Sequence, residues 1–374
     1  MEFPKAYVTS RILHRVTRGA NLRPGEITHL LSISCRQEAD EVFAAAREVR
    51  SRYFGNRVFL YGFIYFSTYC RNNCSFCYYR QDNGLSPRYR KDRSEILGIA
   101  KELADSGVHL IDLTMGEDPE IHRQEGYGQL IELVAAVKQV SGLPVMVSPG
   151  VVPEETLRQL AGAGADWYAL YQETHSRQLF KQLRLGQSFE MRNLARIQAE
   201  KAGLLVEDGI LLGVGESLAD RVHSLRQMSG RKNGQVRVMS LVPQEDTPLS
   251  HLQSPSRLTE LLAIAVLRLL NPDRLIPASL DVEGLQGLAG RLAAGANVVT
   301  SIIPPAQGLA GVSQSTLDIN EGGRTVAGVT PVLKQMGLTA ASLLDYRYWM
   351  NFCLEKERGH NHAHRYRGWP VARC

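Results

Sequence analysis

The sequence predicts an α/β protein that folds as a closed (β/α)8 barrel of the TIM type with an N-terminal helical extension. Three observations support this prediction: strand-like and helix-like segments alternate from residue 58 onward, each strand has its own helix, and eight such pairs occupy about 280 residues. Strands separated by helices of 10–15 residues form parallel βαβ units. Eight units in roughly 250 residues fit a closed barrel better than a doubly wound open sheet, which is the alternative.

The composition is that of an ordinary globular protein. The 374 residues are 44% hydrophobic and 22% charged, with a formal net charge of +5. So mild a charge does not require nucleic acid or a membrane surface as a partner, and no run approaches the roughly 18 apolar residues of a spanning helix. The first residues carry Glu2 and Lys5 instead of the apolar core of a signal peptide, so we expect a cytoplasmic protein.

Residues 1–57 are expected to form a helical cap packed on the barrel, which spans residues 58–340. The cap prediction rests on apolar residues at helical spacing and on one break: Ile12, Leu13 and Val16, then Pro24-Gly25, then amphipathic stretches at 26–31 and 38–50. Cys35 is interpreted as core filler. Residues 341–374 are expected to form a C-terminal helix and a disordered tail.

Within the barrel, apolar runs alternate with amphipathic stretches in a regular order. The predicted strands lie at 59–68, 109–115, 144–148, 167–172, 206–213, 236–242, 275–281 and 298–303. The predicted helices lie at 93–106, 127–140, 153–163, 190–202, 218–230, 257–270, 285–294 and 331–336.

Three cysteines with C-x3-C-x2-C spacing, Cys70, Cys74 and Cys77, directly follow the first predicted strand. Because an all-cysteine 4Fe-4S site needs four thiolates, three would leave one iron of the cluster without a protein ligand. A zinc site would need a fourth Cys or His at finger-like spacing, and the next histidine downstream is His109. A disulfide framework would be shorter and denser in cysteine. The motif favours an open 4Fe-4S cluster over these two alternatives.

This motif resembles the signature of the radical S-adenosylmethionine (SAM) superfamily, in its biotin synthase-like branch. The resemblance implies that the methionine end of SAM chelates the fourth iron. It also implies that an electron from the cluster, supplied by a reduced donor such as ferredoxin or flavodoxin, cleaves SAM into methionine and a 5'-deoxyadenosyl radical. Phe76, between the last two cysteines, matches the aromatic position that contacts the adenosine.

The segments at the ends of other predicted strands resemble SAM-binding segments of the same branch. The carboxyl ends of the strands are where the active sites of such barrels lie. The resemblance implies that Glu117 holds the ammonium of SAM, Glu173 a ribose hydroxyl and Arg192 the SAM carboxylate, which a bidentate guanidinium suits. A helix-capping turn at Glu117 and a surface position for Arg192 are the structural alternatives. The complete set of expected SAM-binding residues is Phe76, Gly116, Glu117, Ser148, Glu173, Arg192 and Gly213.

Polar side chains also interrupt the apolar strands. Arg237 lies in the sixth predicted strand, Asp112 lies in the second, and Ser279 and Asp281 share one face of the seventh. An Asp inside an apolar barrel is costly unless it is paired. These residues therefore indicate either a binding site inside the barrel or ion pairs between adjacent strands.

Together with the cysteine loop, these residues resemble the methylornithine synthase family, the radical SAM lysine mutases of pyrrolysine biosynthesis, along residues 1–355. The resemblance implies L-lysine as substrate and 3-methylornithine as product, with Arg237, Ser279 and Asp281 holding the amino-acid end and Asp112 meeting the other ammonium. The alternatives are another enzyme of the same branch acting on a different amino-acid-like substrate, and an electron-carrier module. The histidine-rich tail at 359–367 matches nothing in the family.

Overall fold

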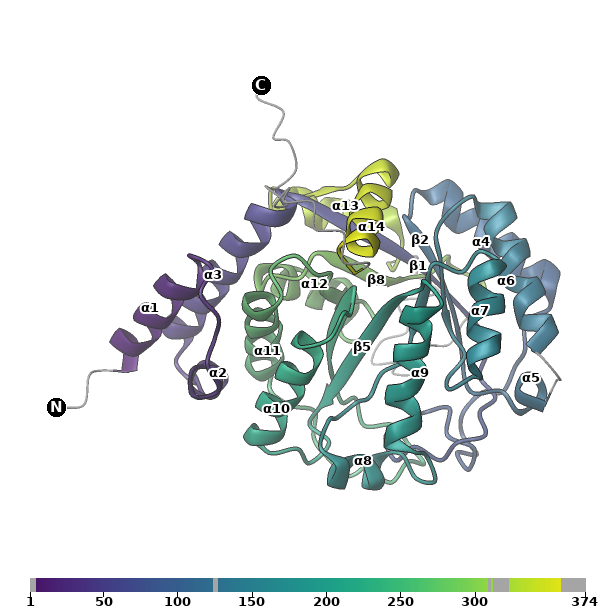
Figure 1. The fold of residues 1–374 in the computed structure, drawn as a ribbon, viewed down its shortest axis with the longest axis horizontal. Helices are drawn as coiled ribbons and strands as arrows, with labels where there is room; N and C mark the ends of the chain where they lie inside the picture. Colours follow the sequence, from purple (N-terminus) through teal and green to yellow (C-terminus); the bar gives the residue numbers. More distant parts are fainter. Residues whose placement is uncertain (1–4, 124–126, 309–310, 312–322, 358–374) are drawn as a thin grey trace.

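Residues 5–123, 127–308, 311 and 323–357 are described by the computed structural model, in which eight parallel strands form a barrel surrounded by helices (Figure 1). Hydrogen-bonded neighbours follow the order β6-β5-β4-β3-β2-β1-β8-β7. A parallel bridge between Gln235 and Leu275 then brings the two ends of this order together. The prediction of a TIM-type barrel is confirmed, and the sheet is nearly closed.

The strands lie close to their predicted positions, and most predicted bounds differ by one or two residues. The eight barrel strands are β1 (Arg57–Ser67), β2 (Leu110–Met115), β3 (Val145–Ser148), β4 (Trp167–Ala169), β5 (Leu205–Leu212), β6 (Gln235–Ser240), β7 (Pro277–Ser279) and β8 (Val298–Ile302). The strand predicted at 167–172 ends early, because the Asp208 carboxylate accepts the backbone N–H of Gln172 (2.9 Å) where a strand would use a carbonyl. Glu173 then takes a positive φ of 66°.

The outer helices are α4 (Arg93–Ser106), α6 (Gly128–Ser141), α7 (Glu154–Gly162), α9 (Phe189–Lys201), α10 (Leu218–Ser229), α11 (Arg257–Leu270), α12 (Gly284–Ala293) and α13 (Val326–Gln335). Short α5 (Pro119–Arg123) and α8 (Arg177–Leu183), which were not predicted, lie in the loops at the carboxyl ends of β2 and β4. The start of α13 was placed too late. Thr325 caps this helix by accepting the Gly328 N–H, and Pro331 lies inside it.

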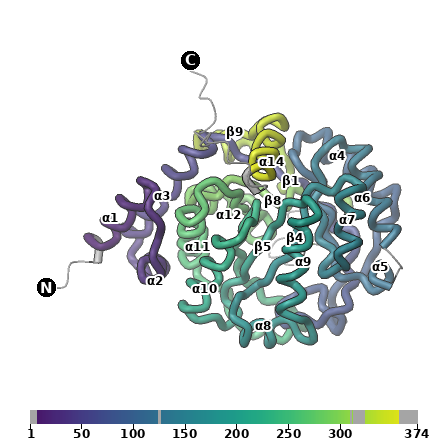
Figure 2. The backbone as a smooth tube through the Cα atoms, viewed as in Figure 1, coloured from purple at the N-terminus to yellow at the C-terminus, as the bar shows by residue number. Residues whose placement is uncertain are grey.

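The N-terminal helices α1 (Lys5–Val16), α2 (Pro24–Leu31) and α3 (Arg36–Phe54) stand on one side of the barrel (Figures 1 and 2) and contact α10, α11 and α12. Arg50 and Arg47 donate hydrogen bonds to the last carbonyls of α12, where a cation is favourable. The interpretation of Cys35 as core filler is wrong: it is exposed, because it precedes α3 and the buried face of that helix begins only at Ala39.

The C-terminal helix α14 (Leu343–Glu357) closes the amino end of the barrel, beside the two-residue strand β9 (Thr339–Ala340), which pairs with the start of β1. Trp349 stacks on Trp167 with ring centres 5.9 Å apart, and the hydroxyls of Tyr346 and Tyr61 are 2.7 Å apart. This aromatic layer lies opposite the carboxyl ends of the strands. The histidine-rich tail and Cys374 lie outside the described residues.

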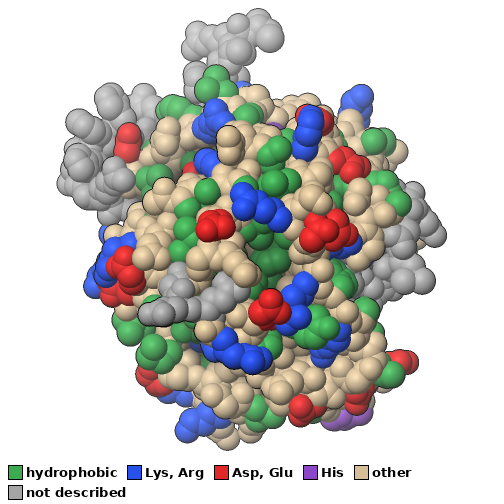
Figure 3. Space-filling view, turned by 90° about the vertical axis from the view of Figure 1, so that its right-hand side faces the viewer, with side chains coloured by type: hydrophobic (Ala, Val, Ile, Leu, Met, Phe, Trp, Pro, Cys, Tyr) green, Lys and Arg blue, Asp and Glu red, His purple; other side chains and the backbone are tan. Residues whose placement is uncertain are grey.

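The surface has no strong segregation of charge on the face that Figure 3 shows, where basic and acidic side chains are interspersed. Among the helices of the described part of the chain, none is both long and apolar enough to cross a membrane.

Candidate active site

A cavity of about 250 Å³ opens at the carboxyl ends of the strands, as expected for a barrel. One wall is the loop that carries Cys70, Cys74 and Cys77, and the opposite wall includes the ends of β6 and β7. All of the predicted site residues line this cavity except Asp112 and Gly213. Gly213 instead forms the turn after β5 with φ of 85°, where a side chain would collide with Pro255.

The cysteine loop is held in place by Arg88 and by a glycine. The Arg88 guanidinium donates hydrogen bonds to four backbone carbonyls at the two ends of the loop: Thr68 (2.6 Å), Tyr79 (3.0 Å), Arg80 (2.6 Å) and Asn83 (3.1 Å). Gly116 lies beneath the loop, where an added Cβ would be only 2.2 Å from the carbonyl oxygen of Tyr69. The end of β2 can approach the loop this closely because Gly116 has no side chain.

The three cysteine sulfurs face one cavity but do not converge on one point. Within the described ranges, no three Cys, His, Asp or Glu side chains are close enough to hold a single metal ion. A cubane fits such spread ligands, because each cysteine binds a different iron. Burial raises the pKa of Cys70 to about 11 and also raises the pKa of Cys77 well above its ordinary value, so these thiols ionise when a metal binds. All five described cysteines are free, so none forms a disulfide.

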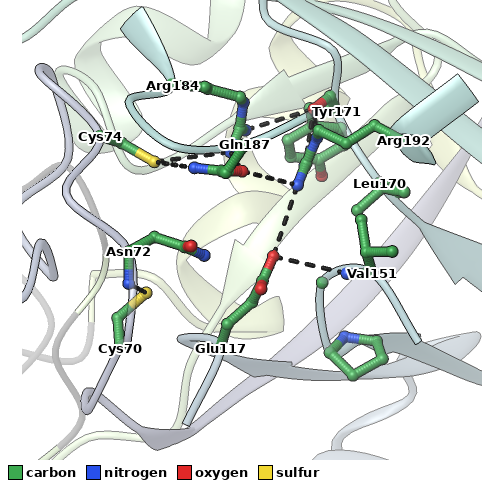
Figure 4. Close-up of polar contacts among 12 residues, drawn as sticks. Cys70, Asn72, Cys74, Glu117, Val151, Leu170, Tyr171, Arg184, Gln187 and Arg192 are labelled. Carbon is green, nitrogen blue, oxygen red and sulfur yellow. Dashed lines mark hydrogen bonds and ion pairs between the residues drawn. The ribbon is translucent and has the colours of Figure 1, made fainter. Parts of the chain in front are cut away.

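Beside the loop, Glu117 and Arg192 form a buried ion pair, with 3.5 Å between Oε1 and Nη1 (Figure 4). Burial alone would raise the pKa of Glu117, but Arg192 and neighbouring donors hold it below its ordinary value, so the carboxylate is ionised. Gly150 makes room for it, since an added Cβ there would lie 2.1 Å from the Glu117 side chain. Arg192 is only 4% exposed, so a surface position is ruled out.

Glu173 is held by Arg184, a residue that sequence reasoning missed. Arg184 Nη2 donates to Glu173 Oε1 at 2.7 Å, whereas Glu173 Oε2 is buried without a hydrogen-bond partner in the described structure. Burial raises the pKa of Glu173, although Arg184 opposes this change. An unsatisfied buried acceptor that borders a cavity suits a ligand hydroxyl. In the sequence, the one indication of a role for Arg184 was its position a few residues before Gln187 and Ser188, at the start of the α9 segment.

Arg237, on β6, forms an ion pair with Glu207 on the adjacent strand β5 (2.7 Å). This is the pairing between strands that the sequence left as a structural alternative. The Nη2 group of Arg237, however, is buried without a partner among the described residues, so it can still donate to a ligand. Tyr171 donates to the second oxygen of Glu207 at 3.0 Å. Glu207 was missed because two acids, Glu207 and Asp208, are adjacent and the sequence does not show which of them faces the barrel interior. Side chains alternate along β5, and the structure turns Glu207 inward and Asp208 outward.

Asp281 does not pair with Arg237 in the described structure, and instead accepts bonds from its own set of donors. Arg324 Nη1 lies 3.0 Å from Oδ1, and Tyr65 donates to both carboxylate oxygens at 3.2 Å. The hydroxyls of Ser301 (2.7 Å) and Ser279 (3.2 Å) reach Oδ2. Ser301, at the end of β8, has a positive φ of 64°. Asp281 is therefore held rigidly at the cavity wall.

Asp112 lies beneath the cavity floor, not in its lining. Its Oδ1 accepts hydrogen bonds from Thr114 (2.9 Å) and Ser148 (3.3 Å), which do line the cavity, while Oδ2 is buried and has no partner in the described structure. Burial, followed by repulsion from Glu207, raises the pKa of Asp112 to about 7.

This pKa predicts a pH-dependent stability. Between about 3.9, the pKa in an unfolded chain, and about 7, the folded protein keeps a proton that the unfolded chain has lost. The stabilisation is complete below the unfolded pKa and is lost as pH rises through about 7. We expect wild type to lose on the order of 3 kcal/mol relative to Asp112→Asn between about pH 5 and about pH 8. Urea unfolding of both cluster-free proteins measures this difference, and parallel pH curves would contradict the assignment.

The fold and this cavity define the class of protein. The sequence profile of the radical SAM superfamily matches residues 64–228, which include the cysteine loop, Glu117, Glu173 and Arg192.

The similar proteins extend over most of the chain. The 3-methylornithine synthase of Methanosarcina barkeri is 47% identical over 89% of this chain and 94% of its own length, and that of Methanosarcina acetivorans is 45% identical over 90% and 95%. A crystal structure of methylornithine synthase superposes with a TM-score of 0.86 at 46% identity, covering 90% of this chain and 99% of that one. The chain therefore belongs to the 3-methylornithine synthase family of radical SAM enzymes.

Membership of this superfamily implies a 4Fe-4S cluster and SAM as cofactors. The residues present fit both groups. Three free cysteines without a single-ion geometry suit the cluster, and the unsatisfied Glu173 Oε2 beside the cavity suits a hydroxyl of SAM.

Proposed function

We propose that this chain converts L-lysine to 3-methylornithine, the first step of pyrrolysine biosynthesis, as a radical SAM mutase. One observation carries the proposal: a single cavity is lined by the three loop cysteines on one side and by Arg237, Ser279 and Asp281 on the other. A substrate bound by the second group would face the cofactors held by the first. The similarity to 3-methylornithine synthases along about 90% of the chain supports the choice of substrate.

In this proposal Cys70, Cys74 and Cys77 hold the cluster. The residues that hold SAM are Phe76, Gly116, Glu117, Ser148, Glu173 and Arg192. When bound, these cofactors supply a 5'-deoxyadenosyl radical that takes a hydrogen atom from the substrate. A reduced donor such as ferredoxin or flavodoxin is the partner that provides the electron.

The charges around the cavity match a lysine zwitterion. The unpaired Nη2 of Arg237 can donate to the substrate carboxylate. Asp281, an acceptor at the cavity wall, suits an ammonium. Asp112 lies below the floor, so in this proposal it acts on the second ammonium through Thr114 and Ser148, which bond to it and line the cavity. In the rearrangement that the family resemblance implies, the Cα–Cβ bond of lysine breaks, and the glycyl fragment then joins the remaining alkene at a different carbon. Because Arg237 and Asp281 are each fixed by other residues, they can hold the glycyl fragment in place until it recombines, which is an effect of proximity.

The test is anaerobic reconstitution with iron, sulfide, SAM and dithionite, followed by incubation with uniformly carbon-13-labelled lysine. Since the product is an isomer of the substrate, the expected readout is a new labelled methyl signal by NMR. Turnover of a different amino acid would support another enzyme of the same branch. Absence of both labelled product and 5'-deoxyadenosine with a fully loaded cluster would point instead to an electron carrier.

A further inference from the structure

Gln187, which follows α8 and precedes α9, joins the cysteine loop to the arginines of the cavity (Figure 4). Its amide nitrogen lies 3.0 Å from the sulfur of Cys74. Its amide oxygen lies 3.3 Å from Nη1 of Arg184 and 3.2 Å from Nη1 of Arg192. Glu117 also contacts both the loop, through Arg71, and Arg192, but of these two side chains it is Gln187 that reaches a cysteine sulfur.

The two arginines determine which way this amide points. A guanidinium has only donors, so the atom of Gln187 that faces both arginines must be the acceptor, the carbonyl oxygen. The NH2 group is therefore turned toward Cys74. The backbone is fixed as well, because the next residue, Ser188, caps α9 by accepting the Met191 N–H at 3.2 Å.

Cys74 is thus the cysteine whose sulfur receives side-chain donors. Arg184 also approaches this sulfur, but at the longer distance of 3.6 Å, and its charge is balanced by Glu173. Hydrogen bonds to ligating sulfurs are among the features that set the reduction potential of an iron–sulfur cluster. A donor withdraws electron density from the sulfur and so favours the reduced, more negative cluster.

We propose that Gln187 is a positioning residue that keeps an amide donor on the cluster-ligating sulfur of Cys74 and thereby raises the reduction potential of the cluster. The inference rests on the proposed function, because it assumes that Cys74 binds the cluster. The same geometry ties this donor to Arg192, the residue expected to bind the SAM carboxylate.

Two variants test the inference. Gln187→Met removes the donor at similar volume, and Gln187→Glu removes the donor but keeps an acceptor for both arginines. The matched control is Gln159→Met, since the Gln159 side chain is exposed on α7 and bonds only to Glu155 among the contacts described. Each reconstituted protein is titrated with dithionite, with redox mediators, and the reduced cluster is followed by EPR.

At the wild-type midpoint, we expect the ratio of oxidised to reduced cluster to rise about tenfold in both Gln187 variants, which for a one-electron couple is about 59 mV. The control should not change. Because the titration reports a ratio, a variant that loads less iron still gives a midpoint. Equal midpoints in all four proteins would overturn the inference but leave the proposed function intact. If wild type itself formed no reducible cluster, the proposed function would fail instead.

Discussion

Cys74→Ala is expected to lose the 4Fe-4S cluster, and with it SAM cleavage and methylornithine formation. The cysteine faces the cavity between Cys70 and Cys77, and no spare thiol is available there, because the remaining described cysteines lie on α14 and before α3. Without three thiolates the cluster has too few protein ligands. Iron and sulfide analysis, together with the EPR signal after reduction, measures the loss.

Cys35→Ala is the matched control, since that cysteine is exposed and distant from the cavity lining. It should retain about four irons per chain, the content of one cubane. Wild-type iron content and SAM cleavage in Cys74→Ala would remove the central assignment of the site.

Arg237→Lys is expected to lower kcat/KM for lysine about 100-fold while leaving the folded protein nearly as stable. A lysine keeps the positive charge beside Glu207, so the buried carboxylate remains compensated. It cannot, however, reproduce the planar pair of donors that a carboxylate requires. Steady-state turnover of lysine and urea unfolding separate the two effects.

The control for this variant lies on α9, the helix that packs against the outer face of β5. Arg196 pairs with Asp208, outside the cavity, just as Arg237 pairs with Glu207 inside it. Arg196→Lys should affect stability more than kcat/KM. Equal losses of kcat/KM in both variants would mean that Arg237 acts only as a structural ion pair.

Much of the barrel could be predicted because the spacing of apolar residues along each helix and strand is a local property of the sequence. The bounds of α4 and α11 match the prediction, since amphipathic periodicity and a capping residue fix each helix. The end of β4 could not be predicted, because it depends on Asp208, a residue 36 positions from the Gln172 N–H that it accepts. Local propensity contains no information about such a contact.

The candidate site also contains residues that the sequence predicts and residues that only the fold reveals. The cysteines were predicted as ligands from their spacing and line the cavity, and the burial of Arg192 agrees with a role inside the protein. Glu207, Arg184 and Arg324 were missed because their significance lies in the partner that each one meets across the barrel. A charged residue in a sequence indicates that a partner is needed, but only the fold identifies it.

The position of α14 has a consequence for synthesis. Tyr346 and Trp349 cover Phe59, Tyr61 and Trp167 at the amino end of the barrel, and β9 pairs with the first residues of β1. On the ribosome, Arg57 of β1 emerges 282 residues before Thr339, its partner on β9 (339 minus 57). A nascent chain that already contains all eight barrel strands still exposes this aromatic surface, the kind of apolar surface through which incomplete chains aggregate. Helix α14, the last in the described part of the chain, therefore completes the hydrophobic core that the first strand begins.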